Sequence, residues 1–264
     1  MNCVERNLVL GRVGFNACTK EELINMIENL NTDKRGAYVS FLGAPHVAIA
    51  ETNEAAAAAY AGATIIAMDG SPVARAAKQC GIVCERCGGP DIMNEILRRS
   101  EKQGRTQYFY GENPEVLKKM VARCQELYPD LRIVGYYAPP YRELSEEEDE
   151  EIVRMIGEQK PDYLWISLGS PKQDCWMAKH AAYFPGTTMM GVGAAFKFLS
   201  GAVRRAPQFW QKLGLEWLYR LLQEPHLMWQ RYLKYAPTFY RIKKKTLKEY
   251  KAQSKIRRET ESAE

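Results

Sequence analysis

The sequence predicts an α/β fold with a doubly wound, mainly parallel, Rossmann-like sheet and a C-terminal helical, basic appendage. The first observation behind this prediction is that short apolar segments alternate with helical segments of about 10 to 15 residues, as in successive βαβ units. The second is that this alternation ends near Pro207, after which only helical patterns follow. We therefore expect an α/β domain over residues 1–203 and the appendage over residues 204–264.

The predicted strands are apolar runs bounded by glycine, proline or polar residues. They cover residues 7–11, 37–42, 63–68, 107–110, 131–135, 162–168 and 187–192. Residues 43–46, which contain Gly43 and Pro45, are expected to form a loop that leaves the second strand. Residues 82–90 are expected to form an irregular, glycine-rich connection before a helix over residues 91–99.

Several predicted helices begin at capping signals. Thr19 with Glu22 and Ser145 with Glu148 have the capping-box spacing, in which side chain and backbone exchange hydrogen bonds at a helix start. The alanine-rich residues 47–60 have a high helix propensity and are expected to form one helix. These signals set the boundaries of the helices between the strands.

One local pattern recurs after strands: a capping residue followed by proline. Ser71-Pro72, Asn113-Pro114 and Ser170-Pro171 each have it, and we expect each pair to begin a helix. Helix N-termini placed there would direct free N–H groups at a ligand, which suits a phosphate group. The alternative is that each pair begins a helix, as such pairs commonly do, and binds no ligand.

The segment that ends at Asp69 is the first candidate for chemistry. Residues 63–68 form an apolar run without a polar side, which is typical of a buried parallel strand. Asp69 and Gly70 follow at its carboxyl end, where open α/β sheets bind their ligands. The alternative is an acid that ends the strand and bonds to the next turn.

The charge of the chain is divided unevenly. Residues 204–264 carry 15 Lys and Arg against 6 Asp and Glu, whereas residues 1–203 have a net charge of −4. Aromatic and basic residues are interleaved over the helices expected at 207–223, 225–235 and 237–258, a pattern typical of helices on an anionic membrane surface. The alternative, preferred for 207–223, is packing on the main domain. Nucleic acid is a third partner class, but no recognition motif accompanies the charge.

Composition excludes several classes of protein. No apolar run approaches the about 20 residues of a transmembrane helix, and the early Glu5 and Arg6 are unlike a secretory signal. The seven cysteines include Cys80, Cys84 and Cys87, but three clustered cysteines without a nearby histidine do not make a usual zinc site. We therefore expect a cytoplasmic protein with reduced thiols and no bound metal.

Common catalytic signatures are absent from the sequence. It contains no G-x-S-x-G, H-E-x-x-H or P-loop motif, and Gly191-Val192-Gly193 lacks the third glycine of a dinucleotide fingerprint and predicts a tight strand-to-helix turn instead. There is no Asp-x-Asp pair to hold a divalent metal on a nucleotide diphosphate. A bound diphosphate would have to be balanced by Arg, Lys and helix N-termini.

A series of blocks in order resembles the TagA/WecG/CpsF family of bacterial glycosyltransferases. The blocks are Met68-Asp69-Gly70-Ser71-Pro72-Val73, Arg86-x-x-Gly89-x-Asp91, Tyr110-Gly111-x-Asn113-Pro114, Tyr128-Pro129, Gly169-Ser170-Pro171-Lys172-Gln173-Asp174, Gly191-Val192-Gly193, Arg205-Ala206-Pro207, Leu215-Glu216-Trp217-Leu218-Tyr219-Arg220-Leu221, Glu224-Pro225 and Arg231-Tyr232. The resemblance covers about residues 8–240. It implies inverting, metal-independent transfer of an N-acetylmannosamine-type sugar from a UDP-sugar to a polyprenyl-diphosphate-linked saccharide, without a cofactor, in teichoic-acid or cell-surface polysaccharide synthesis.

The resemblance also implies roles for single residues. Asp69 matches the proposed catalytic base, and Arg220 and Arg231 would approach the diphosphate from the appendage, which thereby completes the site. Ser40 would supply the hydroxyl of a Thr-x-Asn motif that the family commonly has in the strand exit before the Asp-Gly motif. The remaining residues expected to bind substrate are Arg86, Gly111, Gly169, Lys172, Gln173, Gly191, Gly193 and Arg205. For Arg86, a structural ion pair with Asp91 is the alternative.

The leading hypothesis is therefore a glycosyltransferase bound peripherally to the inner face of the cell membrane. Two alternatives stay open at this point. The chain could be a non-catalytic nucleotide-sugar-binding module, or a nucleic-acid-associated protein that uses the basic tail. A homo-oligomer is a further expectation for its assembly.

Overall fold

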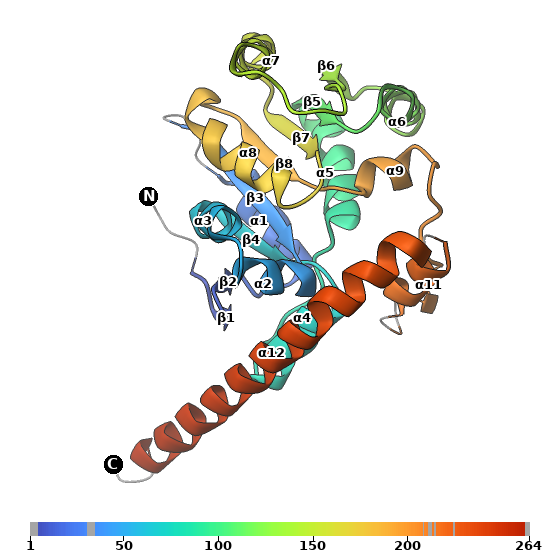
Figure 1. Ribbon diagram of the computed structural model, residues 1–264. Helices are drawn as coiled ribbons and strands as arrows, with labels where there is room; N and C mark the ends of the chain where they lie inside the picture. The colour runs from blue at the N-terminus through green and yellow to red at the C-terminus, as the bar shows by residue number, and fades with distance from the viewer. Residues whose placement is uncertain are drawn as a thin grey trace.

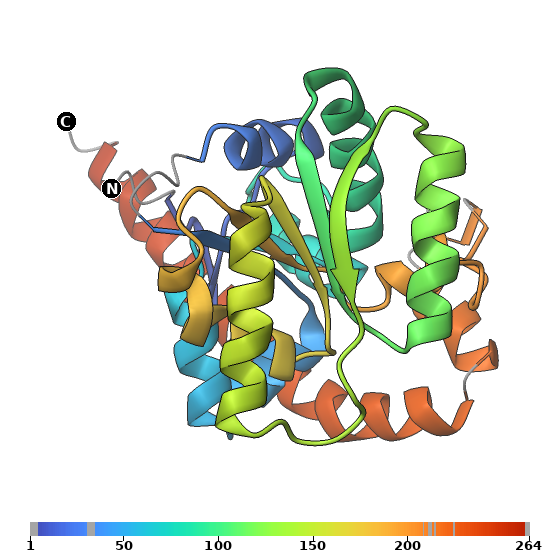
Figure 2. The same ribbon diagram turned by 90° about the horizontal axis from the view of Figure 1, so that it is seen from above.

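The computed structural model describes residues 5–30, 35–207, 209, 210, 213, 215–223 and 225–261. Within these ranges the side chains of residues 220, 226–228, 230–232 and 254–261 are not described. The described chain contains a six-stranded parallel sheet with helices on both faces (Figures 1 and 2). The predicted Rossmann-like α/β fold is thus confirmed.

The sheet has the strand order β4-β3-β8-β7-β5-β6, and all its neighbouring strands are parallel. Its strands are β3 (Ala37–Leu42), β4 (Ile65–Met68), β5 (Thr106–Gly111), β6 (Arg132–Tyr137), β7 (Tyr163–Ser167) and β8 (Thr188–Gly191). A separate antiparallel hairpin joins β1 (Leu8–Leu10) to β2 (Val13–Phe15). The hairpin protects the edge of the sheet, because Asn16 exchanges hydrogen bonds with the Ile66 backbone of β4.

Each face of the sheet has its own hydrophobic core. One core lies under α2 (Ala44–Ala50), α3 (Glu54–Gly62), α7 (Glu146–Gln159), α8 (Lys172–His180) and the long α12 (Pro225–Glu261). The other lies under α1 (Lys20–Glu28), α5 (Gly89–Gln103), α6 (Pro114–Leu127) and α9 (Ala195–Leu199). Successive β4 residues alternate between the two cores, as a strand covered on both faces requires.

The middle of α12 packs on the α/β domain. Phe239, Ile242 and Thr246 are buried, and α12 lies against α2, β1 and α4 (Ser71–Gln79). The Tyr250 hydroxyl donates to the Asn7 carbonyl at 3.2 Å. Core packing, the interpretation that the sequence favoured only for 207–223, thus applies to one side of α12 as well.

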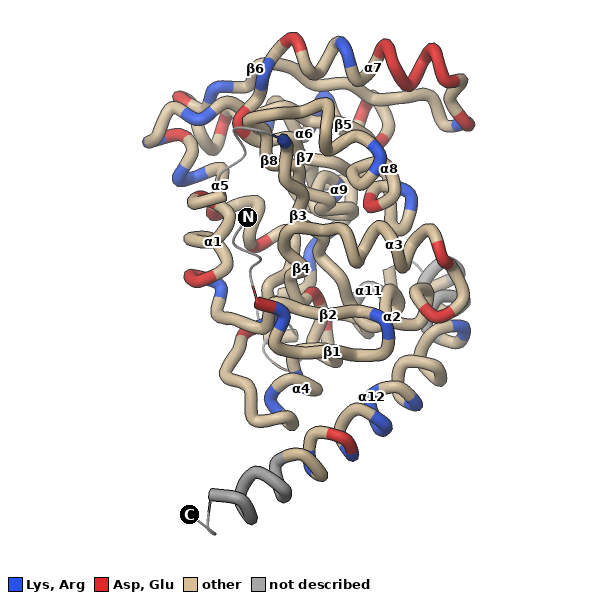
Figure 3. The backbone as a smooth tube through the Cα atoms, turned by 90° about the vertical axis from the view of Figure 1, so that its left-hand side faces the viewer, with Lys and Arg blue, Asp and Glu red and all other residues tan. Residues whose placement is uncertain are grey.

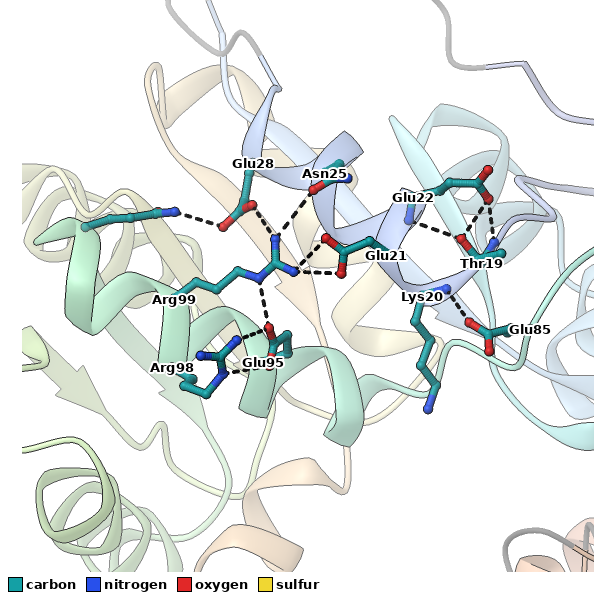
Figure 4. Close-up of polar contacts among 11 residues, drawn as sticks. Thr19, Lys20, Glu21, Glu22, Asn25, Glu28, Glu85, Glu95, Arg98 and Arg99 are labelled. Atoms are coloured by element: carbon teal, nitrogen blue, oxygen red, sulfur yellow. Dashed lines mark hydrogen bonds and ion pairs between the residues drawn. The ribbon is translucent and has the colours of Figure 1, made fainter.

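Arg99 ties α1 to α5. Its guanidinium contacts Glu21 and Glu28 of α1 at 2.7 and 3.0 Å, and Glu95 on its own helix at 2.9 Å (Figure 4). The same close-up shows the confirmed capping box of Thr19 and Glu22, and the Lys20 backbone N–H that donates to Glu85. These contacts fix α1 beside the segment that leads into α5.

Two sequence predictions around α2 and α3 were wrong. Residues 43–46 are not a loop, because Pro45 lies in the first turn of α2, where no backbone N–H is needed. Residues 47–60 do not form one helix either. The Asn53 side chain accepts from the Ala56 N–H, and this cap starts α3 as a new helix.

Two predicted caps and one predicted break were also wrong. Ser71 does not cap α4, since the cap is Gly70 with φ of 92° and Ser71 is already helical. Ser170 does not cap α8, because its hydroxyl donates to the buried Asp174 instead. Helix α12 continues through Pro237, as packing of the following turns outweighs the lost backbone hydrogen bond. By contrast, the caps at Asn113 and Ser145 are confirmed.

Candidate active site at the carboxyl edge of the sheet

The main chain of Asp69 is fixed at the end of β4. Its N–H donates to the Leu42 carbonyl of β3 at 2.9 Å, and Gly70 then turns the chain with a positive φ into α4. A Cβ atom at Gly43 would come within 2.6 Å of the Asp69 carbonyl oxygen, so only glycine permits this approach. Asp69 therefore occupies the position predicted for it.

Asp69 is half-buried, and its carboxyl group has a perturbed pKa. Burial raises this pKa, nearby Arg86 lowers it, and Glu216 and Asp91 raise it again, with a net value of about 6. The group is thus ionised at neutral pH but holds its proton much more tightly than an ordinary aspartate. A carboxyl group in this range suits general-base chemistry.

Four alternating charges form a ring beside Asp69, which we call the ion-pair ring: Arg86, Asp91, Arg205 and Glu216. Asp91 contacts Arg86 at 3.2 Å and Arg205 at 2.7 Å. Glu216, the first residue of α11 (Glu216–Gln223), pairs with Arg86 and lies 3.6 Å from Arg205. Lys20 approaches Asp91 from α1 at 3.8 Å.

Gly88 shows how closely the ring adjoins Asp69. A Cβ atom built on Gly88 would lie 3.1 Å from Asp69 Oδ1, 3.7 Å from Asp91 Oδ2 and 3.9 Å from Arg86 Cζ. The three charged groups thus converge on one point of the chain. The structural ion pair considered for Arg86 and Asp91 is present, and it is also part of the surroundings of Asp69.

A second group of predicted residues meets where β7 and β8 end. The Gln173 side-chain N–H donates to the Gly191 carbonyl at 2.8 Å, and the Ser167 hydroxyl donates to the Gly193 carbonyl at 2.7 Å. Gln173 Oε1 is buried and has no hydrogen-bond partner among the described residues. The turn leads directly into α9, so the predicted strand-to-helix turn is confirmed.

The loops after β5 and β7 bring further predicted residues to the same edge. Gly111 has φ of 116° and lies so close to β7 that an added Cβ would be 2.3 Å from the Ser167 carbonyl oxygen. Gly169 also has a positive φ, and the exposed Lys172 begins α8. These residues share the carboxyl edge with Asp69, but none has a described contact with it.

Ser40 lies in a different, buried cluster. It is in the middle of β3, and its hydroxyl donates to Asp174 at 2.6 Å; Ser170 donates to the other carboxylate oxygen at 2.5 Å. Burial raises the pKa of Asp174, against the two hydroxyl hydrogen bonds. The hydroxyl contact of Ser40 thus ties β3 to the first turn of α8, and none of the described contacts of Ser40 is with the ion-pair ring.

Sequence reasoning missed Glu216, Asp174 and Lys20 as neighbours of the candidate residues. The sequence did contain an indication that Glu216 belongs to the site, because this residue lies within the specific Glu-Trp-Leu-Tyr-Arg-Leu block of the family resemblance. Arg220 and Arg231, predicted to approach a diphosphate, lie on α11 and α12 with side chains outside the described part of the chain.

Two further features of the described residues bear on the class of site. Within the described residues, no three His, Cys, Asp or Glu side chains are grouped so as to hold a metal ion. No described helix combines the length and the apolar character that crossing a membrane would need.

Comparison with known proteins gives consistent matches over most of the chain. The family model described as "Glycosyl transferase WecG/TagA/CpsF family" matches residues 8–252. A Staphylococcus aureus (strain MW2) protein named N-acetylglucosaminyldiphosphoundecaprenol N-acetyl-beta-D-mannosaminyltransferase is 30% identical over 239 residues, covering 87% of this chain and 91% of the relative. The protein of the same name from strain MRSA252 is similar to the same extent, 30% over 239 residues with 87% and 91% covered.

Proposed function

The chain belongs to the glycosyl transferase WecG/TagA/CpsF family, and we propose that it transfers an N-acetylmannosamine-type sugar from a UDP-sugar to a polyprenyl-diphosphate-linked saccharide. It is a glycosyltransferase, as are its curated relatives, whose names specify an N-acetylmannosamine transfer to N-acetylglucosaminyl-diphosphoundecaprenol. The observation that carries the proposal is a half-buried aspartate with a raised pKa, at the carboxyl edge of a Rossmann-like sheet and beside two arginines.

In the proposed reaction, Asp69 is the general base. Its ionised carboxylate accepts the proton of the acceptor hydroxyl while that oxygen attacks the anomeric carbon of the donor sugar. The bond from the anomeric carbon to the diphosphate breaks as the new bond forms, and UDP leaves with the electron pair. A β-linked product from an α-linked nucleotide sugar requires one such displacement with inversion, for which a single base is sufficient.

The charge that develops on the leaving diphosphate needs compensation. We propose that Arg86 and Arg205 provide part of it, with Arg220 and Arg231 as the further arginines that the family resemblance implies. The N-terminus of α8, beside Gly169 and Lys172, and the turn at Gly191–Gly193 are proposed to hold the nucleotide sugar. This distribution of cationic and N–H groups, together with the absence of an Asp-x-Asp pair in the sequence, supports a metal-independent reaction.

The proposal is tested by direct transfer. We expect the purified protein to convert UDP-N-acetylmannosamine and a short polyprenyl-diphospho-N-acetylglucosamine into a lipid-linked disaccharide, with the rate unchanged in EDTA. Other UDP-sugars, each tested with the same acceptor, serve as the controls for donor specificity. The product is followed by mass spectrometry. UDP binding without turnover on any donor would instead favour a non-catalytic nucleotide-sugar-binding module, and activity abolished by EDTA would contradict metal independence.

We further propose that the acceptor is reached at the inner face of the cell membrane, on which the C-terminal helices dock. Trp229, Leu233 and Tyr240 of α12 are exposed, as are the bases Lys234, Arg241, Lys244, Lys245, Lys248 and Lys251. Figure 3 shows the basic positions following one another along this helix. Exposed aromatic residues interleaved with bases suit the interface of an anionic bilayer.

Reversing three exposed charges should weaken vesicle binding. The variant with Lys244→Glu, Lys245→Glu and Lys248→Glu is expected to lower the partition coefficient onto phosphatidylglycerol-containing vesicles at least about 100-fold, because losing each base alone costs about 1 kcal/mol and the introduced glutamates add repulsion. The control reverses Lys102, Lys118 and Lys119, which are exposed on α5 and α6. Equal binding of both variants in a flotation assay would refute this docking surface, and salt-dependent RNA binding without vesicle binding would favour nucleic acid.

A further inference from the structure

Glu216 is the only described member of the ion-pair ring that comes from the C-terminal helices. Its carboxylate pairs with Arg86 through one oxygen and lies 3.6 Å from Arg205 Nε through the other. Arg86 precedes α5, and Arg205 precedes α11 by several residues. The contact between Glu216 and Arg86 therefore joins two parts of the chain that are 130 residues apart in sequence.

Each arginine of the ring is held from two sides. Asp91 and Glu216 both contact Arg86, and both contact Arg205. All four side chains are only 19–22% exposed, so their charges are screened less than those of surface ion pairs. Without Glu216, Asp91 would be the one remaining ion-pair partner of each guanidinium among the described residues, and each guanidinium would gain freedom to rotate away from its present position.

The ring lies beside the proposed base. The charged groups that act on Asp69 are Arg86, Asp91 and Arg205 together with Glu216, and Lys20 of α1 reaches the ring through Asp91. On the α2 side, His46 Nδ1 accepts the Gly43 N–H at 2.7 Å, and a Cβ atom at Gly43 would lie 2.6 Å from the Asp69 carbonyl oxygen and 3.9 Å from this nitrogen. A shift of Arg86 or loss of the Glu216 charge would change the electrostatic surroundings of Asp69.

We propose that Glu216 is a positioning residue that closes the ion-pair ring, so that Arg86 and Arg205 are correctly held beside Asp69 only while α11 is docked. This inference rests on the proposed function, since it gives Glu216 a role in the same site. Helix α11 leads into α12, and the two helices pack on each other. Docking of the C-terminal helices is thereby coupled to the arrangement of the groups around the base.

The test compares Glu216→Gln with Glu216→Asp and with the control Glu126→Gln, which removes an exposed glutamate paired with Arg123 on α6. For Glu216→Gln we expect kcat/KM to fall about tenfold or more, mainly in kcat, because a small misplacement of reacting groups has effects of this size. The acidic limb of its pH profile should move to lower pH, since a negative charge near Asp69 is removed. Glu216→Asp should keep the acidic limb of the pH profile at the wild-type position, and its kcat should lie between those of Glu216→Gln and the wild type.

A second readout does not depend on turnover. Hydrogen exchange of the α11 amides should be faster in Glu216→Gln than in the wild type, and unchanged in Glu126→Gln. If the wild-type protein transfers no sugar while α11 still loosens, the proposed function fails and the docking role stands. The inference is overturned if the wild type is active and Glu216→Gln has the wild-type kcat, the wild-type acidic limb of the pH profile and the wild-type hydrogen-exchange protection of α11. A higher kcat/KM in Glu216→Gln would also overturn it.

Discussion

Replacement of Asp69 by asparagine is expected to lower kcat for sugar transfer by about 10²- to 10⁴-fold, the range typical of losing a general base. Asparagine keeps the size and the backbone contacts of the residue but cannot take up the proton of the acceptor hydroxyl. Donor binding should change little, since the variant retains the arginines and the glycine turns. The measurement is initial-rate kinetics with UDP affinity determined separately by calorimetry, and Asp130→Asn, on an exposed turn, is the matched control.

The pH dependence should identify the same group. Because the base works when ionised and its pKa is about 6, kcat/KM should rise as the pH increases through 6 and then level off. The residual activity of Asp69→Asn should lack this acidic limb. Undiminished transfer by the variant, or an unchanged limb, would remove Asp69 from the base role.

The stability of the Asp69→Asn variant has an expected sign as well. The pKa of Asp69 is higher in the folded protein than the usual value of 3.8, so the folded state binds the proton more tightly than the unfolded state. Ionisation of Asp69 therefore lowers the free energy of unfolding. The loss is complete above pH 6, and it disappears as the pH falls below 3.8, the usual pKa of an aspartate. At neutral pH the variant should unfold at no lower a temperature than the wild type, which separates lost chemistry from lost folding.

Local sequence signals predicted most of the fold. The apolar run before Asp69 and the capping boxes at Thr19 and Ser145 depend on neighbours within a few residues, and the structure has them where expected. The wrong predictions share a cause: the helix boundaries concerned are determined by tertiary contacts and not by neighbouring residues in the sequence. Pro237 was expected to separate two helices, but the burial of residues one turn later keeps α12 continuous.

The candidate site was predictable only in part for the same reason. Asp69 could be located because the end of a strand is a local feature, whereas the partners of Arg86 and Arg205 come from separate elements. Ser40 was predicted to be in a strand, and it is, but its hydroxyl meets Asp174, which is 134 residues away in sequence. Spacing in one sequence does not reveal such contacts.

Phe239→Ala is expected to destabilise the whole protein by about 3–5 kcal/mol, the usual cost of removing a buried phenylalanine side chain. Phe239 is 1% exposed and belongs to the same core as Leu8 and Val47, so its loss leaves a cavity between α12 and the main domain. The control is Leu233→Ala on the same helix. Leu233 is 59% exposed, and its replacement should change the free energy of unfolding by no more than about 0.5 kcal/mol.

This comparison also tests the predicted division at residues 203 and 204. If 204–264 were a separately folded appendage, Phe239→Ala would leave the main unfolding transition in place and weaken only the attachment of the helix. If α12 completes the core, chemical denaturation should show one cooperative transition with a lower midpoint and an unchanged slope. We expect the single transition, because Phe239, Ile242 and Thr246 are buried together on the side of α12 that faces α2, while the exposed bases lie on its remaining surface. One helix would then both stabilise the fold and present a basic surface, so that weakening its packing should lower the stability of the whole domain together with transfer to a membrane-bound acceptor.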